Sequence, residues 1–280
     1  MIAPLPPGVL LCVVFLFGIV IGSFLNVCIH RWPRGRSVVK PRSHCVRCRK
    51  TLSWYENIPV FSYLVLRGRC RHCGRHISIR YPAVELIAGL LFFFFVWTLG
   101  PTPAALKMCV FTAMLVSLIF CDLEKRLLPD QLTLGGALIG LAFAAFVKVP
   151  DDTSRLLFAI FGLELAGRTE RLAQSAAGAA LPAFFLWGGG WLYARLRHRE
   201  GLGLGDVKLM LMVGSFLGLQ YTLSSMLLGS LAGSVISLLY IWAAKKDAAT
   251  YPLPFGTFLG AAALVVALAG QKVFGWYGGM

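Results

Sequence analysis

The stretch Arg199-Glu-Gly-Leu-Gly-Leu-Gly-Asp-Val-Lys-Leu-Met-Leu-Met212 places one carboxylate at the start of an apolar segment. That carboxylate, Asp206, follows Gly203 and Gly205, whose glycine backbones can unwind or approach a substrate closely. A charged group beside hydrocarbon is costly, so an ionisable residue in such a position is a candidate functional residue. The Gly-x-Gly-Asp tetrapeptide alone is a weak pattern, and a catalytic role for Asp206 requires a partner elsewhere in the chain.

The composition predicts the class of protein around this stretch. Of the 280 residues, 58% are hydrophobic and only 14% are charged. Soluble domains are typically about 45–50% apolar and about 25% charged. We therefore expect an all-α polytopic membrane protein.

The apolar runs predict about eight transmembrane helices. The first, residues 8–29, has no Lys or Arg before it, which favours a helix with its N-terminus outside over a cleaved signal peptide. We expect three regions: this helix within residues 1–29, a polar cytoplasmic domain at 30–81, and a seven-helix domain at 82–271. The seven later apolar segments are 82–99, 103–121, 131–148, 174–194, 206–219, 221–243 and 253–271.

The basic residues support this orientation. Of 27 Lys and Arg residues, 21 fall in the connections expected inside the cell and 6 in those expected outside. Lys and Arg favour the cytoplasmic side of a membrane, so the net charge of +15 mostly reflects the membrane topology. Anionic lipid headgroups are the expected neighbours of these basic residues. Nucleic acid is not needed to explain the charge. The longest outside connection, 149–173, has an apolar face typical of a surface-lying helix and no evident chemistry.

Two Cys-x-x-Cys pairs in the polar domain predict a structural zinc site. Cys45 and Cys48 are separated from Cys70 and Cys73 by 21 residues, slightly more than in most zinc ribbons. The polar domain has few apolar runs that could form a hydrophobic core, so it also needs a bound metal or a similar cross-link to fold. A redox pair or free thiols are the alternatives. The other cysteines, which lie in or beside apolar segments, are expected to be small core residues: Cys12, Cys28, Cys109 and Cys121.

A partner for Asp206 is available at another expected cytoplasmic turn. Asp122 ends one apolar segment, and Asp130 opens the next. If two carboxylates met there, one could activate water while the other polarised a peptide carbonyl, which is aspartyl protease chemistry. The alternative is that both are helix-end charges, with Pro129 as a helix start.

The sequence resembles the bacterial type IV prepilin peptidases, which are leader peptidases and N-methyltransferases with a Gly-x-Gly-Asp active site. The matching pieces follow the family order across nearly the whole chain. The chain departs from the family pattern at two points. The connection at 149–173 looks longer than is usual in the family, and the proline that often follows the first cysteine there is absent. These pieces are Gly22-Ser-Phe-Leu-Asn-Val27, the two Cys-x-x-Cys pairs, Trp54-Tyr-Glu-Asn-Ile-Pro59, Arg80-Tyr-Pro-Ala-Val-Glu85, Asp122 to Asp130, Gly203 to Leu209 and Pro254-Phe-Gly256.

The resemblance implies a catalytic pair and a substrate. Asp122 and Asp206 would be catalytic, and the supporting residues would be Gly203, Gly205, Lys208 and Asp130. The substrates would be prepilins and pseudopilins, whose short basic leader is cut at the cytoplasmic face of the bacterial inner membrane. The new N-terminus would then be methylated with S-adenosyl-L-methionine. The sequence contains no dinucleotide-type glycine fingerprint for a methyl donor, and Glu56 and Asn57 are only weak candidates.

Two other functions are compatible with parts of the pattern. An intramembrane aspartyl protease with a different substrate would share Gly-x-Gly-Asp but would not need the four-cysteine domain. A transporter could use the acidic residues as an ion path, but such proteins often contain inverted repeats, and no convincing internal symmetry is found. The sequence does not specify an oligomeric state.

Overall fold

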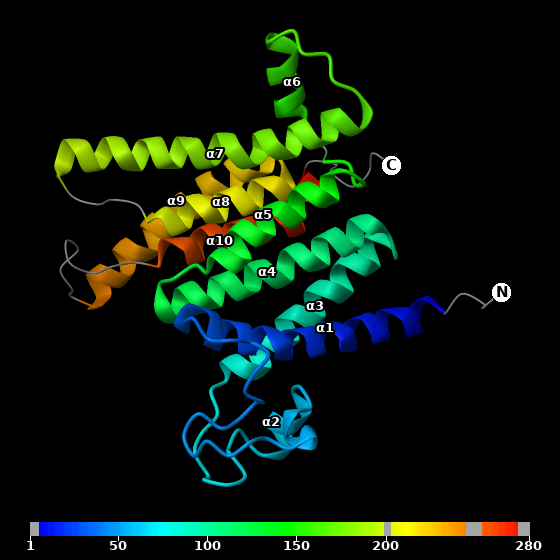
Figure 1. The fold of residues 1–280 in the computed structure, drawn as a ribbon, viewed down its shortest axis with the longest axis vertical. Coiled ribbons are helices and arrows are strands. Elements are labelled where there is room, and N and C mark those ends of the chain that lie inside the picture. The colour runs from blue at the N-terminus through cyan, green and yellow to red at the C-terminus, as the bar shows by residue number, and fades with distance from the viewer. Residues whose placement is uncertain (1–5, 150, 199–202, 245–253, 274–280) are drawn as a thin grey trace. The chain divides into compact units, whose positions relative to one another are not determined.

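The computed structural model describes residues 6–149, 151–198, 203–244 and 254–273, and within these ranges every helix or strand element is a helix. Figure 1 shows the helices in chain order. One short 3-10 turn, Trp32–Arg34, precedes the first cysteine pair, and a second, Trp54–Asn57, lies between the two pairs. The α-helices are α1 (Pro7–Arg31), α2 (Phe61–Val65), α3 (Arg80–Leu99), α4 (Pro103–Lys125), α5 (Asp130–Ala144), α6 (Asp152–Ile160), α7 (Gly167–Arg197), α8 (Leu204–Leu217), α9 (Leu219–Ala244) and α10 (Phe255–Val273).

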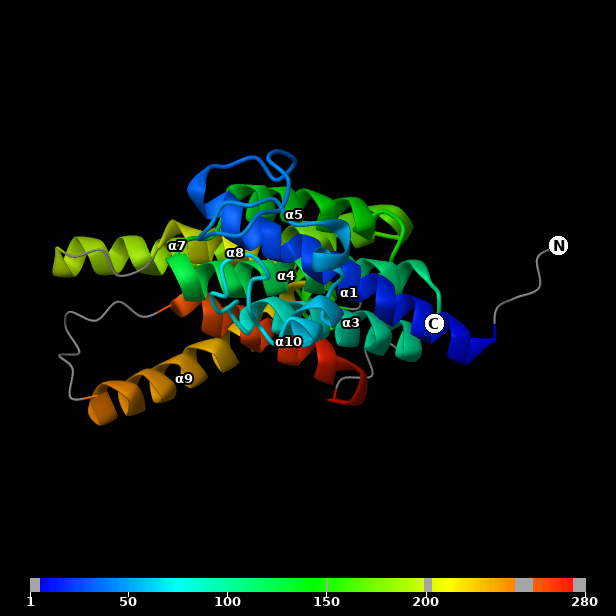
Figure 2. The ribbon, with the colours of Figure 1, turned by 90° about the horizontal axis from the view of Figure 1, so that it is seen from below.

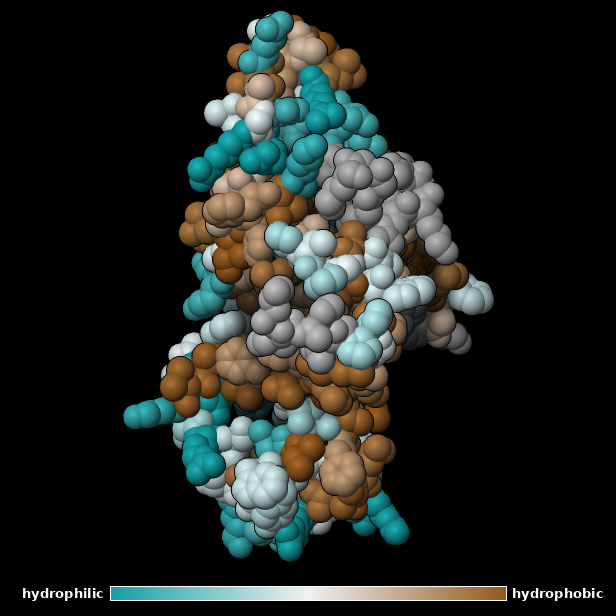
Figure 3. Space-filling view, turned by 90° about the vertical axis from the view of Figure 1, so that its right-hand side faces the viewer, coloured by the Kyte–Doolittle hydropathy of each residue, from teal (hydrophilic) through white to brown (hydrophobic). Residues whose placement is uncertain are grey.

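Each expected apolar segment lies mainly within a helix of its own. Within the described residues, four stretches are long and apolar enough to cross a membrane: Pro7–Arg34, Arg80–Leu99, Pro103–Lys125 and Leu219–Ala243. Large apolar side chains are exposed along these helices, and brown, hydrophobic atoms cover much of the face in Figure 3. In Figure 2 the later part of α9 extends away from α10, and Trp242 there is 82% exposed. These exposed apolar surfaces suit a lipid environment, so the prediction of an all-helical membrane protein is confirmed, while the count of eight spans stays a prediction.

The chain divides into two compact units, Met1–Ser117 and Leu118–Met280, with the division inside α4. In the first unit, α1 packs on α3 through glycines. A Cβ added at Gly22 would lie 2.6 Å from the Cα of Glu85, and one at Gly18 would lie 2.8 Å from the Cα of Gly89. Such an approach is possible only without side chains, which supports the packing interpretation of the Gly22-Ser-Phe segment.

In the second unit, α8 is the central helix and packs against α5, α7, α9 and α10. Its crossing with α7 depends on Gly214, where a Cβ would overlap the backbone of Gly178. The hydroxyl of Ser175 also donates to the carbonyl of Ser215 at 2.6 Å. Because α8 is held on several sides, the residues at its N-terminal end have a fixed position. Its fully buried apolar side chains are Leu209, Met210, Met212, Val213, Phe216 and Leu217.

The connection at 149–173, which was expected outside, contains a buried carboxylate that the sequence did not indicate. Asp151 is fully buried and accepts hydrogen bonds from the backbone N–H and the hydroxyl of Ser154, at 3.1 and 2.5 Å. It also accepts from the backbone N–H groups of Leu219 and Gln220, at 2.5 and 3.4 Å. One side chain therefore caps both α6 and α9 and fixes where this connection begins. Figure 1 shows α6 turned away from the axis of α7.

Three of the four cysteines outside the Cys-x-x-Cys pairs are buried as expected, namely Cys28, Cys109 and Cys121. The expectation for Cys12 is wrong, because that side chain is exposed. It lies in the first half of α1, where several apolar neighbours are exposed as well. The small cysteine side chain suits the three buried positions. Its size does not determine which way the side chain of Cys12 faces.

Candidate active site and metal centre

Both proposed catalytic carboxylates lie in the second unit at helix ends. Asp122 is in the last turn of α4, which ends because Arg126 adopts a left-handed backbone with φ of +52°. The N–H of Arg126 then donates to the carbonyl of Asp122 at 2.8 Å. Asp206 is in the first turn of α8, where its charge is favourable to the helix dipole. Both residues are buried, with exposures of 6% for Asp122 and 9% for Asp206.

The structure brings the two carboxylates together beside Gly256. A Cβ added at Gly256 would lie 3.0 Å from Oδ1 of Asp206 and 3.2 Å from Oδ2 of Asp122. The two oxygens are therefore at most 3.0 plus 3.2, or 6.2 Å, apart. The same Cβ would also lie 3.0 Å from Cδ1 of Leu128, so a side chain at this position would crowd the pair. Glycine leaves the space between the carboxylates open.

Thr257 holds Asp122 from the N-terminal end of α10. Its backbone N–H donates to Oδ2 of Asp122 at 2.6 Å, and its hydroxyl donates to the same oxygen at 2.8 Å. The first N–H groups of a helix have no partner within the helix, so this end binds an anion readily. Among the described residues, no hydrogen-bond donor reaches the side chain of Asp206. The two carboxylates thus have different surroundings.

The supporting residues occupy the same end of this unit but make other contacts. Lys208 Nζ lies 2.8 Å from Oδ1 of Asp130, and this ion pair is partly exposed. Gly203 is the N-cap of α8, and its carbonyl accepts from the N–H of Asp206 at 3.1 Å. A Cβ at Gly205 would lie 3.3 Å from Leu128, so this glycine allows a close packing contact. These observations fit positioning roles for the glycines and a surface ion pair for Asp130.

Substitution of Thr257 by Val should lower kcat/KM for the expected peptide cleavage about 10-fold. The hydroxyl donor to Asp122 is lost, whereas the backbone donor remains, and a hydrogen bond to a charged group contributes about 1.5–3 kcal/mol. We expect the loss in kcat with KM little changed, because Thr257 positions a carboxylate and does not hold the substrate. Thr257→Ser should keep nearly full activity. Equal rates for the Val and Ser variants would contradict this role.

In the first unit, four sulfurs form a compact cluster. The Sγ atoms of Cys45, Cys48, Cys70 and Cys73 all lie within 4.8 Å of one another, and those of Cys45 and Cys73 are 3.9 Å apart. A tetrahedral zinc site with Zn–S bonds of about 2.3 Å requires sulfurs about 3.8 Å apart. The cluster therefore fits a four-thiolate metal site, and the expectation that these four residues come together is confirmed.

The two cysteine pairs are presented by similar turns. The N–H of Cys45 donates to the carbonyl of Lys50 at 3.0 Å, and that of Cys70 donates to Arg75 at 2.8 Å. In each turn the residue after the second cysteine has a left-handed backbone, with φ of +58° at Arg49 and +64° at Gly74. Each Cys-x-x-Cys spacing therefore forms one knuckle, and the two knuckles contribute two sulfurs each.

The thiols of the cluster differ in acidity. Desolvation raises the pKa of Cys45, but backbone N–H groups of Cys48 and Arg47 and hydrogen bonds to neighbouring thiols lower it to about 7. The backbone N–H of Arg75 lowers the pKa of Cys73, but desolvation and hydrogen bonds to the other thiols raise it to about 11. Neighbouring sulfurs thus share protons, which a bound cation would displace.

Two models of known protein families match the chain. The bacterial peptidase A24 N-terminal domain matches residues 16–99, and the type IV leader peptidase family matches residues 109–238. A prepilin leader peptidase/N-methyltransferase from Aeromonas salmonicida (strain A449) is 35% identical, over 97% of this chain and 94% of its own length. The chain belongs to the prepilin leader peptidase/N-methyltransferase family.

Other relatives in this family carry the same name. One from Burkholderia pseudomallei (strain 1026b) is 33% identical over 99% of this chain and 91% of its own length. One from Myxococcus xanthus is 40% identical over 83% of this chain but spans only 63% of that protein. No solved structure matches the chain significantly. The family resemblance from the motifs is confirmed.

Sequence reasoning missed two residues that lie beside the carboxylate pair. In the sequence, Gly256 is only the end of a matching Pro-Phe-Gly segment, and Thr257, which follows it, belongs to no recognisable motif. A threonine at the start of an apolar run is ordinary for a helix N-terminus. Only its two contacts with Asp122 distinguish it.

Proposed function

We propose that Asp122 and Asp206 are the catalytic pair with which this leader peptidase cleaves prepilins and pseudopilins. The observation that supports the proposal is the separation of at most 6.2 Å between their carboxylate oxygens, set by the contacts around Gly256. Two carboxyl groups so close, in a buried site, can share one proton and act as acid and base. This is the arrangement that peptide hydrolysis by an aspartyl protease requires.

The different surroundings of the two carboxylates support a different role for each residue. Two donors from Thr257 stabilise the negative charge of Asp122, so Asp122 serves as the base that takes a proton from water. Asp206 carries the shared proton and donates it to the oxygen of the scissile carbonyl as the water oxygen bonds to its carbon. The C–N bond then breaks, the amine takes the proton held by Asp122, and a hydroxyl of the intermediate returns a proton to Asp206.

The proposed topology brings the substrate to this site. With eight spans and an outside N-terminus, residues 30–81 and the ends of α4 and α8 that carry the aspartates would face the cytoplasm of a bacterial inner membrane. A basic leader would remain in the cytoplasm while the precursor's apolar helix lies in the bilayer. The expected segment at 206–219 corresponds to α8, which ends at Leu217. At about 1.5 Å per residue this helix is shorter than the roughly 30 Å hydrocarbon core, which would let leader and lipid-embedded helix meet near Asp206.

Zinc and a methyl donor complete the proposal. The four-sulfur cluster fits a closed zinc site, which would stabilise the loops between α1 and α3 without taking part in chemistry. When bound, S-adenosyl-L-methionine would supply the methyl group for the new terminal amine: the C–S bond would break with its electron pair on sulfur, and the amine would lose a proton. Lipids are the expected surroundings of the exposed apolar helices.

Mass analysis of a co-expressed type IV pilin precursor tests this function. The expected product lacks its leader and carries one methyl group on the new N-terminal nitrogen. Co-expression without the enzyme supplies the matched control, in which the leader is retained. An uncleaved precursor in the presence of folded enzyme would contradict the peptidase assignment, and a cleaved but unmethylated product would contradict the methyltransferase part.

A further inference from the structure

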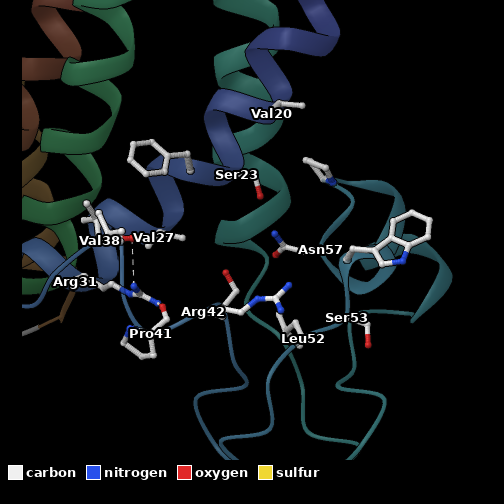
Figure 4. A pocket seen from close by; sticks show the side chains of 15 residues that line it. Val20, Ser23, Val27, Arg31, Val38, Pro41, Arg42, Leu52, Ser53 and Asn57 are labelled. Carbon is white, nitrogen blue, oxygen red and sulfur yellow. Dashed lines mark hydrogen bonds between the residues drawn. The ribbon is translucent and has the colours of Figure 1, made fainter.

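A pocket of about 480 Å³ lies in the first unit, between the C-terminal half of α1 and the loop that carries the first cysteine pair. Figure 4 shows its lining, in which Val20, Ser23 and Val27 of α1 face residues 38–43 and 52–59. Ligand pockets commonly enclose about 300–1,000 Å³, so this one is large enough for a nucleoside-sized molecule. The two proposed catalytic carboxylates, by contrast, belong to the second unit.

One wall of the pocket is fixed by Arg31. This buried guanidinium donates to the backbone carbonyls of Ser37, Val38 and Pro41, at 3.1, 3.3 and 2.7 Å. Because both terminal nitrogens of Arg31 are engaged, its role is to hold the loop against α1. The guanidinium of Arg31 is thereby engaged by backbone carbonyls and is not available to a ligand. These contacts give the pocket a preformed shape.

Three other lining residues present groups without a partner. Among the described residues, nothing contacts the guanidinium of Arg42 or the amide of Asn57 through a hydrogen bond or an ion pair. In Figure 4 both side chains are directed into the hollow. The indole of Trp54 is 76% exposed, and its N–H also lacks a partner in the described part of the chain. An arginine, an amide and an indole with free recognition groups are typical of a binding site.

The chemistry of these groups defines the ligand. The described lining contains no carboxylate, and Arg42 offers a single planar fork that matches one carboxylate. Asn57 can donate to and accept from hydroxyls or the edge of a base. The face of Trp54 suits an aromatic base or a positively charged sulfur. By contrast, an anionic lipid phosphate is usually bound by several basic groups, and only Arg42 is available here.

We propose that this pocket binds the methyl donor, a sulfonium nucleoside with an amino-acid carboxylate. Arg42 binds the carboxylate, Asn57 binds a hydroxyl or a base edge, and Trp54 packs on the base or the sulfonium. The assignment rests on the methyltransferase part of the proposed function. Of the two weak sequence candidates, the structure favours Asn57, because Glu56 accepts from the N–H of Ser53 at 2.8 Å and does not line the pocket.

Equilibrium binding of S-adenosylmethionine to the purified full chain in detergent tests this pocket. Arg42→Ala should raise the dissociation constant roughly 10- to 100-fold, because a charge-assisted pair is lost. Asn57→Ala should raise it several-fold. Trp54→Leu should reduce any preference for S-adenosylmethionine over S-adenosylhomocysteine, which lacks the positive charge on sulfur. Lys50→Ala, an exposed basic residue of the same loop outside the pocket, is the matched control and should bind like wild type.

The outcomes separate the pocket from the function. Zinc content and thermal unfolding equal to wild type would show that the variants are folded. If the wild type binds the donor and methylates a cleaved pilin while Arg42→Ala and Asn57→Ala bind equally well, the pocket assignment is overturned and the function stands. If the wild type neither binds nor methylates, both fail. Loss of phosphatidylglycerol adducts from Arg42→Ala in native mass spectrometry, with donor affinity unchanged, would identify a lipid site and overturn the proposal.

Discussion

Replacing Asp122 or Asp206 by Asn should lower the rate of leader cleavage by at least about 100-fold, and by up to about 10,000-fold. Each change keeps the size of the side chain but removes a group that must gain or lose a proton. Because Thr257 donates to Asp122 and no described donor reaches Asp206, the remaining aspartate is not expected to take over the role of the one replaced. The measurement is cleavage of a purified prepilin in detergent, followed by gel shift and mass analysis of the product.

Glu124→Gln supplies the matched control for this experiment. Glu124 is an exposed acid two residues from Asp122, in the same last turn of α4, and should retain near wild-type activity. A general effect of removing negative charge from this turn would affect all three variants alike. If both Asp variants still cleaved the precursor at the wild-type rate, the aspartyl mechanism would be wrong.

The double substitution Cys45→Ser and Cys73→Ser should reduce bound zinc from about one ion per chain to none. It removes one sulfur from each knuckle of a cluster whose four Sγ atoms lie within 4.8 Å. Zinc binding to comparable four-ligand sites contributes about 10–16 kcal/mol, so its loss should unfold the loops between α1 and α3. Metal analysis of the purified protein and limited proteolysis of residues 30–81 measure the two effects.

Cys12→Ser is the matched control, because Cys12 is exposed on α1 and does not belong to the cluster. This variant should keep its zinc and the protease resistance of the loops. Stoichiometric zinc in the double variant would rule out the four-thiolate assignment. The same preparation also tests whether the zinc domain is needed for methylation, since the loop with the first cysteine pair lines the pocket of Arg42.

Much of the site was predictable because its parts have local patterns. Cys-x-x-Cys spacing defines a knuckle within a few residues, and both cysteine turns form as expected. Asp122 and Asp206 were recognisable because each carboxylate adjoins an apolar segment. Thr257 and Asp151 were not recognisable, since a threonine or an aspartate at a helix start normally serves only as a cap. Their partners, Asp122 and the start of α9, lie far away in the sequence.

The sequence by itself determined the helical class, the approximate position of each helix, the cysteine knuckles and the family. These features depend on hydropathy and hydrogen bonding within a window of a few turns. The tertiary structure alone decided that Asp122 and Asp206 share one site, that Gly256 leaves room between them and that Thr257 holds one of them. It also decided that Arg42 and Asn57 face one pocket. Proximity of this kind depends on how several helices and loops pack together, which is set by close contacts between residues distant in the chain.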